Sequence, residues 1–494
     1  MTLVEHLPVL VVILPLMAAP LCVVVDHRRA AWLIALAAAW LSLAGSIALL
    51  QQVHANGALD YQLGGWPPPW GIEYRVDLLG AYVLLIVCAI AALVLWFARL
   101  SVEREIAANR IVHFYAIFLL AFAGMVGMIA TGDAFNLFVF LEISALSSYA
   151  LISMGRDRRA LNAAFQYLVM GTLGATFILI GIGFLYMMTG TLNMLDLAAR
   201  LPAVSDTRTV RAGFAFLTVG IGLKLALFPL HLWLPNAYAY APSTVTAFLS
   251  ATATKVAVYV LLRFLLEVFG ADFSLGRMPL DTFLLVLGLL GTLLASLVAI
   301  YQTDVKRMLA YSSVAQIGYM VLGIGLASTL GVTAAMLHLF NHALMKGALF
   351  LALGAVAYRI GSVTLRDFAG LGQRMPWTMS AIVIGGLSLI GVPPTVGFVS
   401  KWYLVQATLE QGLWPIAVLI LIGSLLALIY IWKLVETAYF GRPAGDVAVV
   451  GEAPWSMQVS IWLLVGANLY FGIDTDLTVG VARDAAGSLL GGTG

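Results

Sequence analysis

The chain alternates between long apolar stretches and short polar ones from one end to the other. An apolar stretch of about 20 residues is the length of helix that crosses the hydrocarbon core of a bilayer. We therefore predict an all-α polytopic membrane protein with about 14 transmembrane helices. The predicted spans are residues 7–25, 30–50, 78–100, 111–131, 133–154, 162–188, 211–234, 243–268, 280–302, 307–327, 331–357, 377–405, 414–440 and 455–473.

Short polar loops join these spans, and the longest loop covers residues 51–77. Its prolines, in the segment GGWPPPW at 64–70, exclude a helix, and its tryptophans are typical of a membrane–water interface. A polar tail is expected after residue 474. We divide the chain into helices 1–3 (residues 1–110), five helices (111–268), five more (280–440), and a last helix with the tail (441–494).

Two of the predicted spans contain prolines that interrupt a helix. The seventh span carries Pro229, and the twelfth carries Pro393 and Pro394 in the segment GVPPTVGFVSK. Proline lacks a backbone donor and clashes with the preceding turn, so both spans should break. Broken spans at corresponding positions in two halves of a transporter indicate an ion or substrate site. Because these two lie five spans apart, helices 4–8 and 9–13 are predicted to form two inverted five-helix repeats.

The composition agrees with a membrane protein and excludes a nucleic-acid-binding one. The chain is 62% hydrophobic and 10% charged, with a net charge of +2. Most loop cations follow odd-numbered spans, so the positive-inside rule predicts both termini on the outer side. These cations are Arg28, Arg29, Arg99, Arg104, Arg110, Arg156, Arg158, Arg159, Lys306, Arg307, Arg359, Arg366, Arg374 and Arg442. Cys22 and Cys88 lie in apolar segments without metal-binding spacing, so we expect no disulfide, metal or haem site.

Four lysines fall inside the predicted spans, and they are Lys224, Lys255, Lys346 and Lys401. A charge at the bilayer centre costs roughly 2.5–3.5 kcal/mol on insertion scales, so buried charges usually serve a function. Glu142 lies in the middle of span five and needs either a proton or a cationic partner. Lys224, beside the break of span seven, is the nearest partner by type. The alternative is a static ion pair that only orients two helices.

Span eleven carries His338, His342 and Lys346 at positions i, i+4 and i+8. This spacing places them on one helix face, about 6 Å apart along the axis, which suits a proton relay. The alternatives are ordinary hydrogen-bonded histidines or a zinc site, which lacks a third ligand nearby. Lys255 has no acidic neighbour on its own helix and lies too deep to reach an interface easily. Lys401 follows the break of span twelve.

Several stretches carry a specific resemblance. The chain resembles the antiporter-like membrane subunits shared by respiratory complex I, membrane-bound hydrogenases and Mrp-type Na+/H+ antiporters. The stretches are residues 223–242, 304–319 (DVKRMLAYSSVAQIGY), 338–350 (HLFNHALMKGALF) and 391–401. Residues 64–77 and 132–152 are most similar to the D subunit of the Mrp antiporters.

The resemblance implies a fourteen-helix fold with inverted repeats and broken helices 7 and 12. It implies that Glu142 and Lys224 form the glutamate–lysine pair of the first repeat, and that Lys255 bridges the middle of the membrane. His338, His342 and Lys346 would form the central relay, and Lys401 the terminal lysine. One departure is Asn236, where many relatives carry Asp.

The resemblance also implies a function. The chain is expected to be the proton-translocating subunit of a monovalent cation (Na+)/proton antiporter in a bacterial inner membrane, working with other membrane subunits in the lipid bilayer. It is expected to have no catalytic, cofactor-binding or metal-binding residues of its own. The alternative is a proton-pumping subunit of a redox-driven complex, either an NADH-quinone oxidoreductase or a membrane-bound hydrogenase. A third interpretation, a structural scaffold without ion traffic, does not account for the buried charges.

Overall fold

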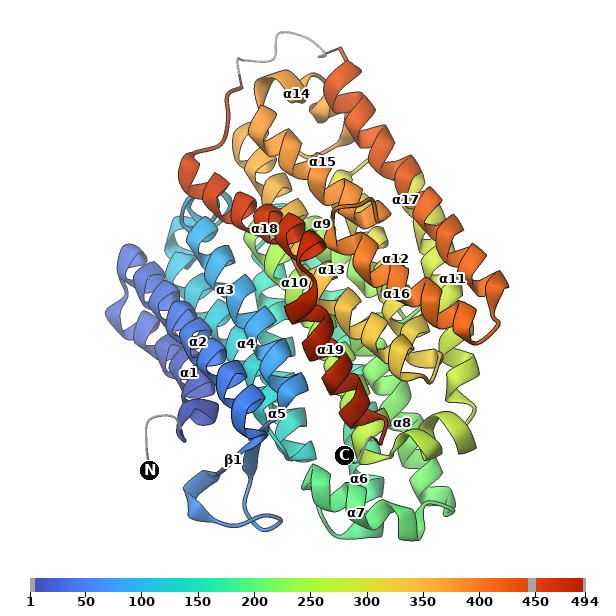
Figure 1. Ribbon diagram of the computed structural model, residues 1–494. Coiled ribbons are helices and arrows are strands. Elements are labelled where there is room, and N and C mark those ends of the chain that lie inside the picture. The colour runs from blue at the N-terminus through green and yellow to red at the C-terminus, as the bar shows by residue number, and fades with distance from the viewer. Residues whose placement is uncertain (1–4, 443–449, 492–494) are drawn as a thin grey trace.

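The computed structural model describes residues 5–442 and 450–491, and helices make up almost all of it (Figure 1). Within these residues, twelve helices are long and apolar enough to cross a membrane, and each matches a predicted span. The two other predicted spans, 211–234 and 377–405, are each divided into two helices. The fold class is therefore confirmed, whereas the count of 14 spans and the four-part division of the chain stay predictions.

The helices and strands follow one another along the chain without a separate soluble domain in the described residues. They are α1 (Leu7–Val25), α2 (Arg28–Asn56), β1 (Leu59–Gln62), β2 (Glu73–Val76), α3 (Leu78–Glu105), α4 (Ile111–Ala130), α5 (Ala134–Ser153), α6 (Arg159–Thr189), α7 (Met194–Val204), α8 (Arg208–Leu225), α9 (Trp233–Tyr240), α10 (Ser243–Leu262), α11 (Leu280–Ile300), α12 (Val305–Gly325), α13 (Thr329–Ile360), α14 (Leu371–Arg374), α15 (Pro376–Ile390), α16 (Val396–Glu410), α17 (Trp414–Phe440), α18 (Trp455–Ile473) and α19 (Asp476–Leu489).

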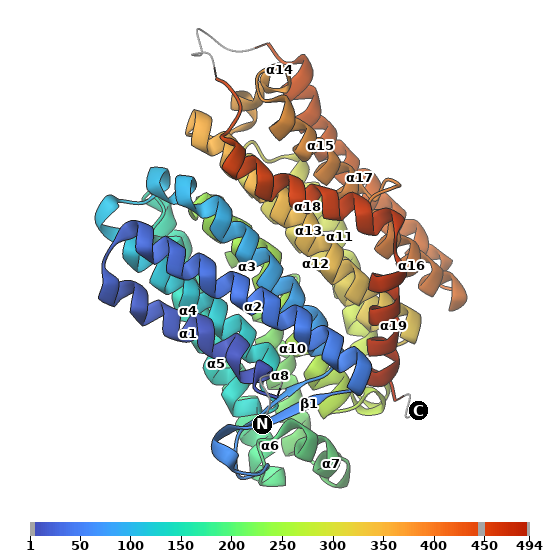
Figure 2. The same ribbon diagram turned by 60° about the vertical axis from the view of Figure 1, so that its left-hand side comes forward.

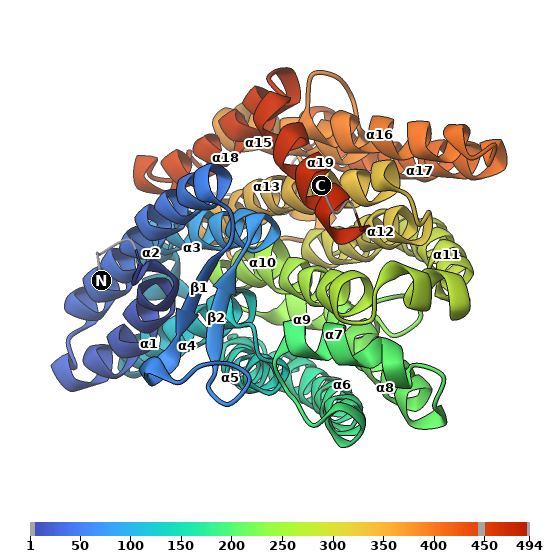
Figure 3. The same ribbon diagram turned by 60° about the horizontal axis from the view of Figure 1, so that its bottom comes forward.

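Helices α10 and α13 pack against each other in the centre of the bundle (Figure 3). The N-terminal helices α1–α4 lie on one side of this pair, and α16 and α17 lie on the other (Figures 1 and 2). Helices α10 and α12 are buried over nearly their whole length, whereas α2, α6, α11 and α17 expose most of their surface. The buried helices α10 and α12 are less apolar than these outer helices, as expected for a bundle whose outer surface faces lipid and whose polar side chains lie inside.

Small residues let some helices approach closely. Along the contact of α11 with α12, a Cβ added at Gly288 would lie 2.8 Å from the carbonyl oxygen of Gly318. A Cβ added at Gly318 would in turn lie 2.5 Å from the carbonyl oxygen of Gly288. Between apolar helices in lipid, such small residues supply the close packing that the hydrophobic effect cannot.

The sequence interpretation was wrong about two polar segments. The loop 51–77 contains a two-stranded antiparallel sheet, in which Leu59 pairs with Val76 and Gln62 with Glu73. The prolines at 67–69 lie between the two strands. They exclude a helix there, but they do not indicate that the residues on either side pair as a hairpin. The expected polar tail is instead the amphipathic helix α19, which packs on α3 and α13. Its buried residues are small or apolar and recur with helical spacing, whereas its exposed face is polar.

Both ends of the described chain lie at the end of the bundle that carries the hairpin. His6 is 3.2 Å from the hydroxyl of Tyr61 in β1, and Leu489 lines a cavity together with Gly57. The short helix α14 lies at the opposite end (Figure 1). This arrangement is compatible with two termini on one side of the membrane, and which side that is stays a prediction.

The close packing of α11 on α12 can be tested with Gly318→Ala. We expect a loss of about 1–3 kcal/mol of stability, because the added methyl group has no room unless the two helices separate. The measurement is the melting temperature of the purified protein in detergent. Gly183→Ala on α6 is the control, since an added Cβ there meets nothing within 4 Å. Equal melting temperatures for the two variants would contradict the packing argument.

Candidate functional site

The first helix break lies between α8 and α9. Helix α8 ends at Leu225, Ala226 adopts a left-handed conformation with φ of 61°, and α9 begins at Trp233. Pro229 lies in the connecting turn, as the sequence predicts. The carbonyl oxygen of Leu223 accepts the backbone N–H of Ala226 at 3.2 Å and, on its second lone pair, Trp233 Nε1 at 2.9 Å. The break thus exposes backbone acceptors inside the membrane-spanning part of the chain.

Lys224 lies in the last turn of α8 and faces Glu142 on α5. Its Nζ is 3.7 Å from Glu142 Oε1 and 3.5 Å from the hydroxyl of Tyr149. The lysine side chain is 8% exposed and the glutamate side chain 27%. The predicted partners are therefore brought together, although Glu142 Oε1 receives no hydrogen bond from the described residues. Both contacts of the ammonium are long, so its position is not fixed by close hydrogen bonds.

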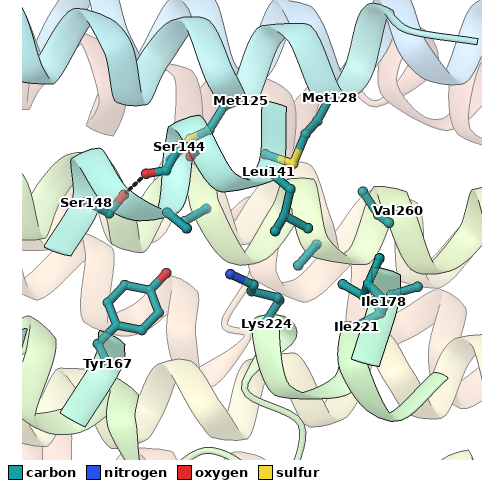
Figure 4. A pocket seen from close by; sticks show the side chains of 13 residues that line it. Met125, Met128, Leu141, Ser144, Ser148, Tyr167, Ile178, Ile221, Lys224 and Val260 are labelled. Atoms are coloured by element: carbon teal, nitrogen blue, oxygen red, sulfur yellow. Dashed lines mark hydrogen bonds between the residues drawn. The ribbon is translucent and has the colours of Figure 1, made fainter. Parts of the chain in front are cut away.

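A small cavity adjoins this pair (Figure 4). Its volume is about 40 Å³, and Lys224, Tyr167, Ser144 and Ser148 supply its polar lining. The ammonium of Lys224 and the hydroxyl of Tyr167 both point toward the space between them (Figure 4). A water molecule needs roughly 10–15 Å³ of such space and two to four polar partners. The cavity can therefore hold about two waters beside the lysine.

The second helix break lies between α15, which ends at Ile390, and α16, which begins at Val396. Here Lys401 Nζ donates to the carbonyl oxygens of Leu389 at 2.8 Å and Ile390 at 3.0 Å, and to Ser424 Oγ at 2.9 Å. Its charge also lies 4.8 Å from the ring centre of Tyr319. All three donors of the ammonium are thus used, two of them on carbonyls that the break releases. Pro393 and Pro394 lie between the two helices, as predicted.

Between the breaks, α13 presents His338, His342 and Lys346 on one face. The rings of His338 and His342 are nearly parallel, with centroids 6.2 Å apart. His338 Nδ1 lies 2.8 Å from Ser400 Oγ, on the residue that precedes Lys401. Lys346 donates to the carbonyl oxygen of Leu309 at 2.8 Å. The predicted ladder is therefore present, and Ser400 connects its His338 end to α16.

Lys255 on α10 is completely buried and has no carboxylate partner among the described residues. It donates to the carbonyl oxygen of Ser250 and lies 3.3 Å from Thr254 Oγ1. It is also near enough to interact electrostatically with His338, His342 and Lys346.

The structure thus groups the predicted residues into two sets. Glu142 and Lys224 form the first set, and Lys255 together with the residues of α13 and α16 forms the second. In the part of the chain that the structure describes, no direct hydrogen bond joins Lys224 to Lys255. Helix α10 turns Ala253 and Ala257 toward the cavity at Lys224, and so carries Lys255 on another face.

Neutral residues at the site escaped the sequence interpretation. Tyr149, Tyr167 and Tyr319 contact the lysines or line their cavity, and Ser400 and Ser424 hydrogen bond to the second set. The feature of the sequence that could have identified these residues is the presence of hydroxyl side chains within otherwise apolar spans. No group of three His, Cys, Asp or Glu side chains in residues 5–442 and 450–491 could hold a metal ion.

A bundle of apolar helices with two breaks and with buried lysines and histidines near them is typical of an antiporter-like membrane subunit. Residues 131–427 match the family model described as NADH:quinone oxidoreductase/Mrp antiporter, transmembrane. The chain belongs to this family. The match covers both helix breaks and all seven predicted pathway residues.

Individual relatives come from both branches of the family. The chain is 45% identical over 440 residues to the N subunit of the NADH-quinone oxidoreductase of Desulforudis audaxviator, covering 88% of this chain and 86% of that one. It is 32% identical over 397 residues to the D subunit of the Na(+)/H(+) antiporter of Alkalihalophilus pseudofirmus, covering 80% and 79%. A chain of the Mrp complex from Dietzia sp. DQ12-45-1b superposes with a TM-score of 0.92 at 27% identity, covering 100% of this chain and 98% of that one.

The link between the second break and Lys401 can be tested with Gly391→Ala. Gly391 has φ of 92°, and an added Cβ would lie 2.9 Å from Lys401 Cδ. We expect a loss of about 1–2 kcal/mol from backbone strain, together with impaired ion transport because the lysine is displaced from its acceptors. The measurements are the melting temperature and the transport rate of the assembled complex.

Gly412→Ala is the matched control for this substitution. Gly412 also has a positive φ, of 71°, but an added Cβ there meets nothing within 4 Å. The Gly412→Ala variant should lose about as much stability as Gly391→Ala does, and it should keep the normal rate of ion transport. If both variants transport equally well, the position of Lys401 at the break is not important for the activity.

Proposed function

We propose that this chain is the proton-translocating subunit of a multisubunit monovalent cation (Na+)/proton antiporter. Protons move along the buried residues Glu142, Lys224, Lys255, His338, His342, Lys346 and Lys401. The observation that carries this proposal is the presence of two sets of buried titratable side chains, one beside each broken helix. A titratable group deep in a membrane protein is costly, so seven such groups in one protein favour ion transfer over a purely structural role.

The two ends of this line are suited to different steps. At Lys224 the contacts are long, a cavity for water adjoins the ammonium, and the carboxylate of Glu142 balances its charge. Loss of the lysine proton leaves Glu142 without its counter-charge, so the charge states of the two groups depend on each other. At Lys401 three short hydrogen bonds hold the ammonium in one place. The first end therefore favours exchange of protons with water, and the second favours retention of a charge.

The middle of the line supplies groups that both accept and donate protons. A neutral imidazole carries one donor and one acceptor, so His338 and His342 can pass a proton between lysines when water joins them. Their ring centres lie 6.2 Å apart, so transfer between them requires a bridging water or a movement of one ring. Transfer needs each group to lie within hydrogen-bond reach of the next group or of one water.

The alternative function is proton pumping in a redox-driven complex. The identity of 45% to the N subunit of an NADH-quinone oxidoreductase favours it, whereas the superposition on an Mrp complex along the whole chain favours the antiporter. The experiment that separates them uses the purified complex with its partner subunits in liposomes. An antiporter moves protons after a Na+ jump without any NADH or quinone, and a redox-driven pump does not.

Glu142→Ala tests the coupling of the first pair. We expect ion exchange to be lost while the complex still assembles, because Lys224 is left without its counter-charge. Exchange is measured in inverted vesicles with a pH-sensitive dye, and assembly by native gel electrophoresis. Glu142→Asp should be impaired less, and Glu267→Ala is the control, since Glu267 pairs with Arg263 on its own helix at 2.7 Å. Full exchange in Glu142→Ala would contradict the proposal.

Lys255→Ala and Lys346→Ala test the central relay. Each should lower exchange per assembled complex by at least about tenfold, the factor for roughly 1.4 kcal/mol of barrier, while assembly is kept or improved because a buried charge is removed. Lys306→Ala is the control, since Lys306 is also buried and donates to the carbonyl oxygen of Ala241 outside the proposed line. Lost assembly with normal exchange per complex would favour a structural scaffold.

A further inference from the structure

Two separate cavities approach the first helix break from different sides. The small cavity described above adjoins Lys224 and is lined in part by Tyr167. A second, open cavity of about 480 Å³ is lined by residues of α6, α9 and α12 and by Leu232, and we call it the vestibule. Trp233 is one of its lining residues. Because α9 does not continue α8, the vestibule lies next to the turn that separates the two helices.

A pair of aromatic rings separates the two cavities. Tyr167 lines the cavity at Lys224, and Trp233 lines the vestibule. Their rings are stacked, with centroids 3.9 Å apart and planes inclined by only 3°. Both residues are nearly completely buried. Two stacked rings at van der Waals distance leave no space for water between them, so water from the vestibule cannot reach Lys224 between these two rings.

Each ring of the pair is held by the groups around Lys224. Trp233 Nε1 donates to the carbonyl oxygen of Leu223, the residue before Lys224. The ring of Tyr167 packs edge-on against Tyr149, with centroids 4.6 Å apart, and the hydroxyl of Tyr149 lies 3.5 Å from Lys224 Nζ. A displacement of Lys224 therefore affects both rings. It acts on Trp233 through the carbonyl group of Leu223, and on Tyr167 through Tyr149.

The lining of the vestibule indicates that water can occupy it. Its polar side chains are Gln166, Asn236, Arg307 and Tyr311, and Asn236 donates to Gln166 at 2.8 Å. Among the described residues, its lining contains one guanidinium and no carboxylate. The amide, guanidinium and hydroxyl groups can bind water, whereas the positive charge of Arg307 disfavours the accumulation of any cation in the vestibule.

We propose that the stacked pair Tyr167–Trp233 is the barrier between the water of the vestibule and Lys224. The pair keeps the path closed while Lys224 is held near Glu142, and it opens when Lys224 moves. This inference rests on the proposed function for the use of the path. The barrier itself is a property of the closed protein and can be measured without any exchange activity.

The experiment measures passive proton leak through the assembled complex in liposomes, with a pH-sensitive dye and no sodium gradient. Trp233→Ala and Tyr167→Leu each remove one ring, and we expect the leak to rise by roughly tenfold, the factor for a barrier lower by about 1.4 kcal/mol. Trp233→Phe keeps a ring in the stack and should stay close to the unmodified protein. Phe165→Ala is the matched control, because it removes an aromatic ring from the vestibule wall but not from the stack.

A thiol-accessibility measurement covers the case in which the ring variants fail to assemble. The two native cysteines are buried and free, so they give little background. Asn236→Cys, in the vestibule, should react with a charged, membrane-impermeant thiol reagent from one side of the membrane. Ser148→Cys, in the cavity at Lys224, should not react with a small neutral thiol reagent unless the stack is removed.

Two results would overturn the inference. The first is an unchanged leak in both Trp233→Ala and Tyr167→Leu. The second is reaction of Ser148→Cys at the rate of Asn236→Cys in the protein with an intact stack. The barrier and the proposed function can also fail separately. If the ring variants leak protons but the unmodified complex shows no Na+/H+ exchange, the proposed antiport is refuted and the barrier is established.

Discussion

An ammonium group inside a lipid-embedded bundle needs hydrogen-bond acceptors, and this requirement governs the centre of the structure. A carbonyl inside a helix already accepts one hydrogen bond from the helix, so a lysine that donates to it shares the oxygen, as Lys255 and Lys346 do at Ser250 and Leu309. At Lys401 the end of α15 releases two carbonyls, and Ser424 supplies the third acceptor. At Lys224 the end of α8 is used differently, because the carbonyl oxygen of Leu223 accepts from Ala226 N and from Trp233 Nε1, and a carboxylate balances the lysine. The two helix breaks therefore set the surroundings of Lys224 and Lys401, whereas the two central lysines use intact helices.

Part of this arrangement could be predicted from the sequence. The length of the apolar stretches gives the spans, and Pro229, Pro393 and Pro394 give the positions of the breaks, because both signals are local. The lysines are conspicuous because a charge is costly in an apolar span. The pairing of Glu142 with Lys224 was predicted from charge alone, and the structure places their side chains 3.7 Å apart. The transport roles of these residues, which the family resemblance implies, stay predictions.

Other features could not be predicted because their cause lies far away in the chain. The acceptors of Lys346 belong to Leu309 and Ser312 on another helix, and a backbone carbonyl leaves no mark in a sequence. The stack of Tyr167 on Trp233 joins α6 to α9, and each residue alone looks like an ordinary aromatic in a span. Helix α19 was taken for a tail because its polar face masks a buried stripe of small residues. Its packing on α3 and α13 needs the surface of those helices, which periodicity does not describe.

Some buried histidine nitrogens at the centre of the bundle have no hydrogen-bond partner in the described protein. Both ring nitrogens of His342 and Nε2 of His338 have no hydrogen-bond partner among the described protein atoms. A buried polar atom without a partner costs about 1–3 kcal/mol, so a static core would fill these positions with apolar side chains. Groups that pass a proton need free positions, because an imidazole saturated by fixed protein partners cannot accept another bond. Lys255, Lys346 and Lys401 donate to fixed acceptors, whereas Lys224 makes only long contacts and the two histidines keep ring nitrogens without a protein partner among the described residues. The proposed relay therefore joins groups that the fold holds in place to groups that it does not.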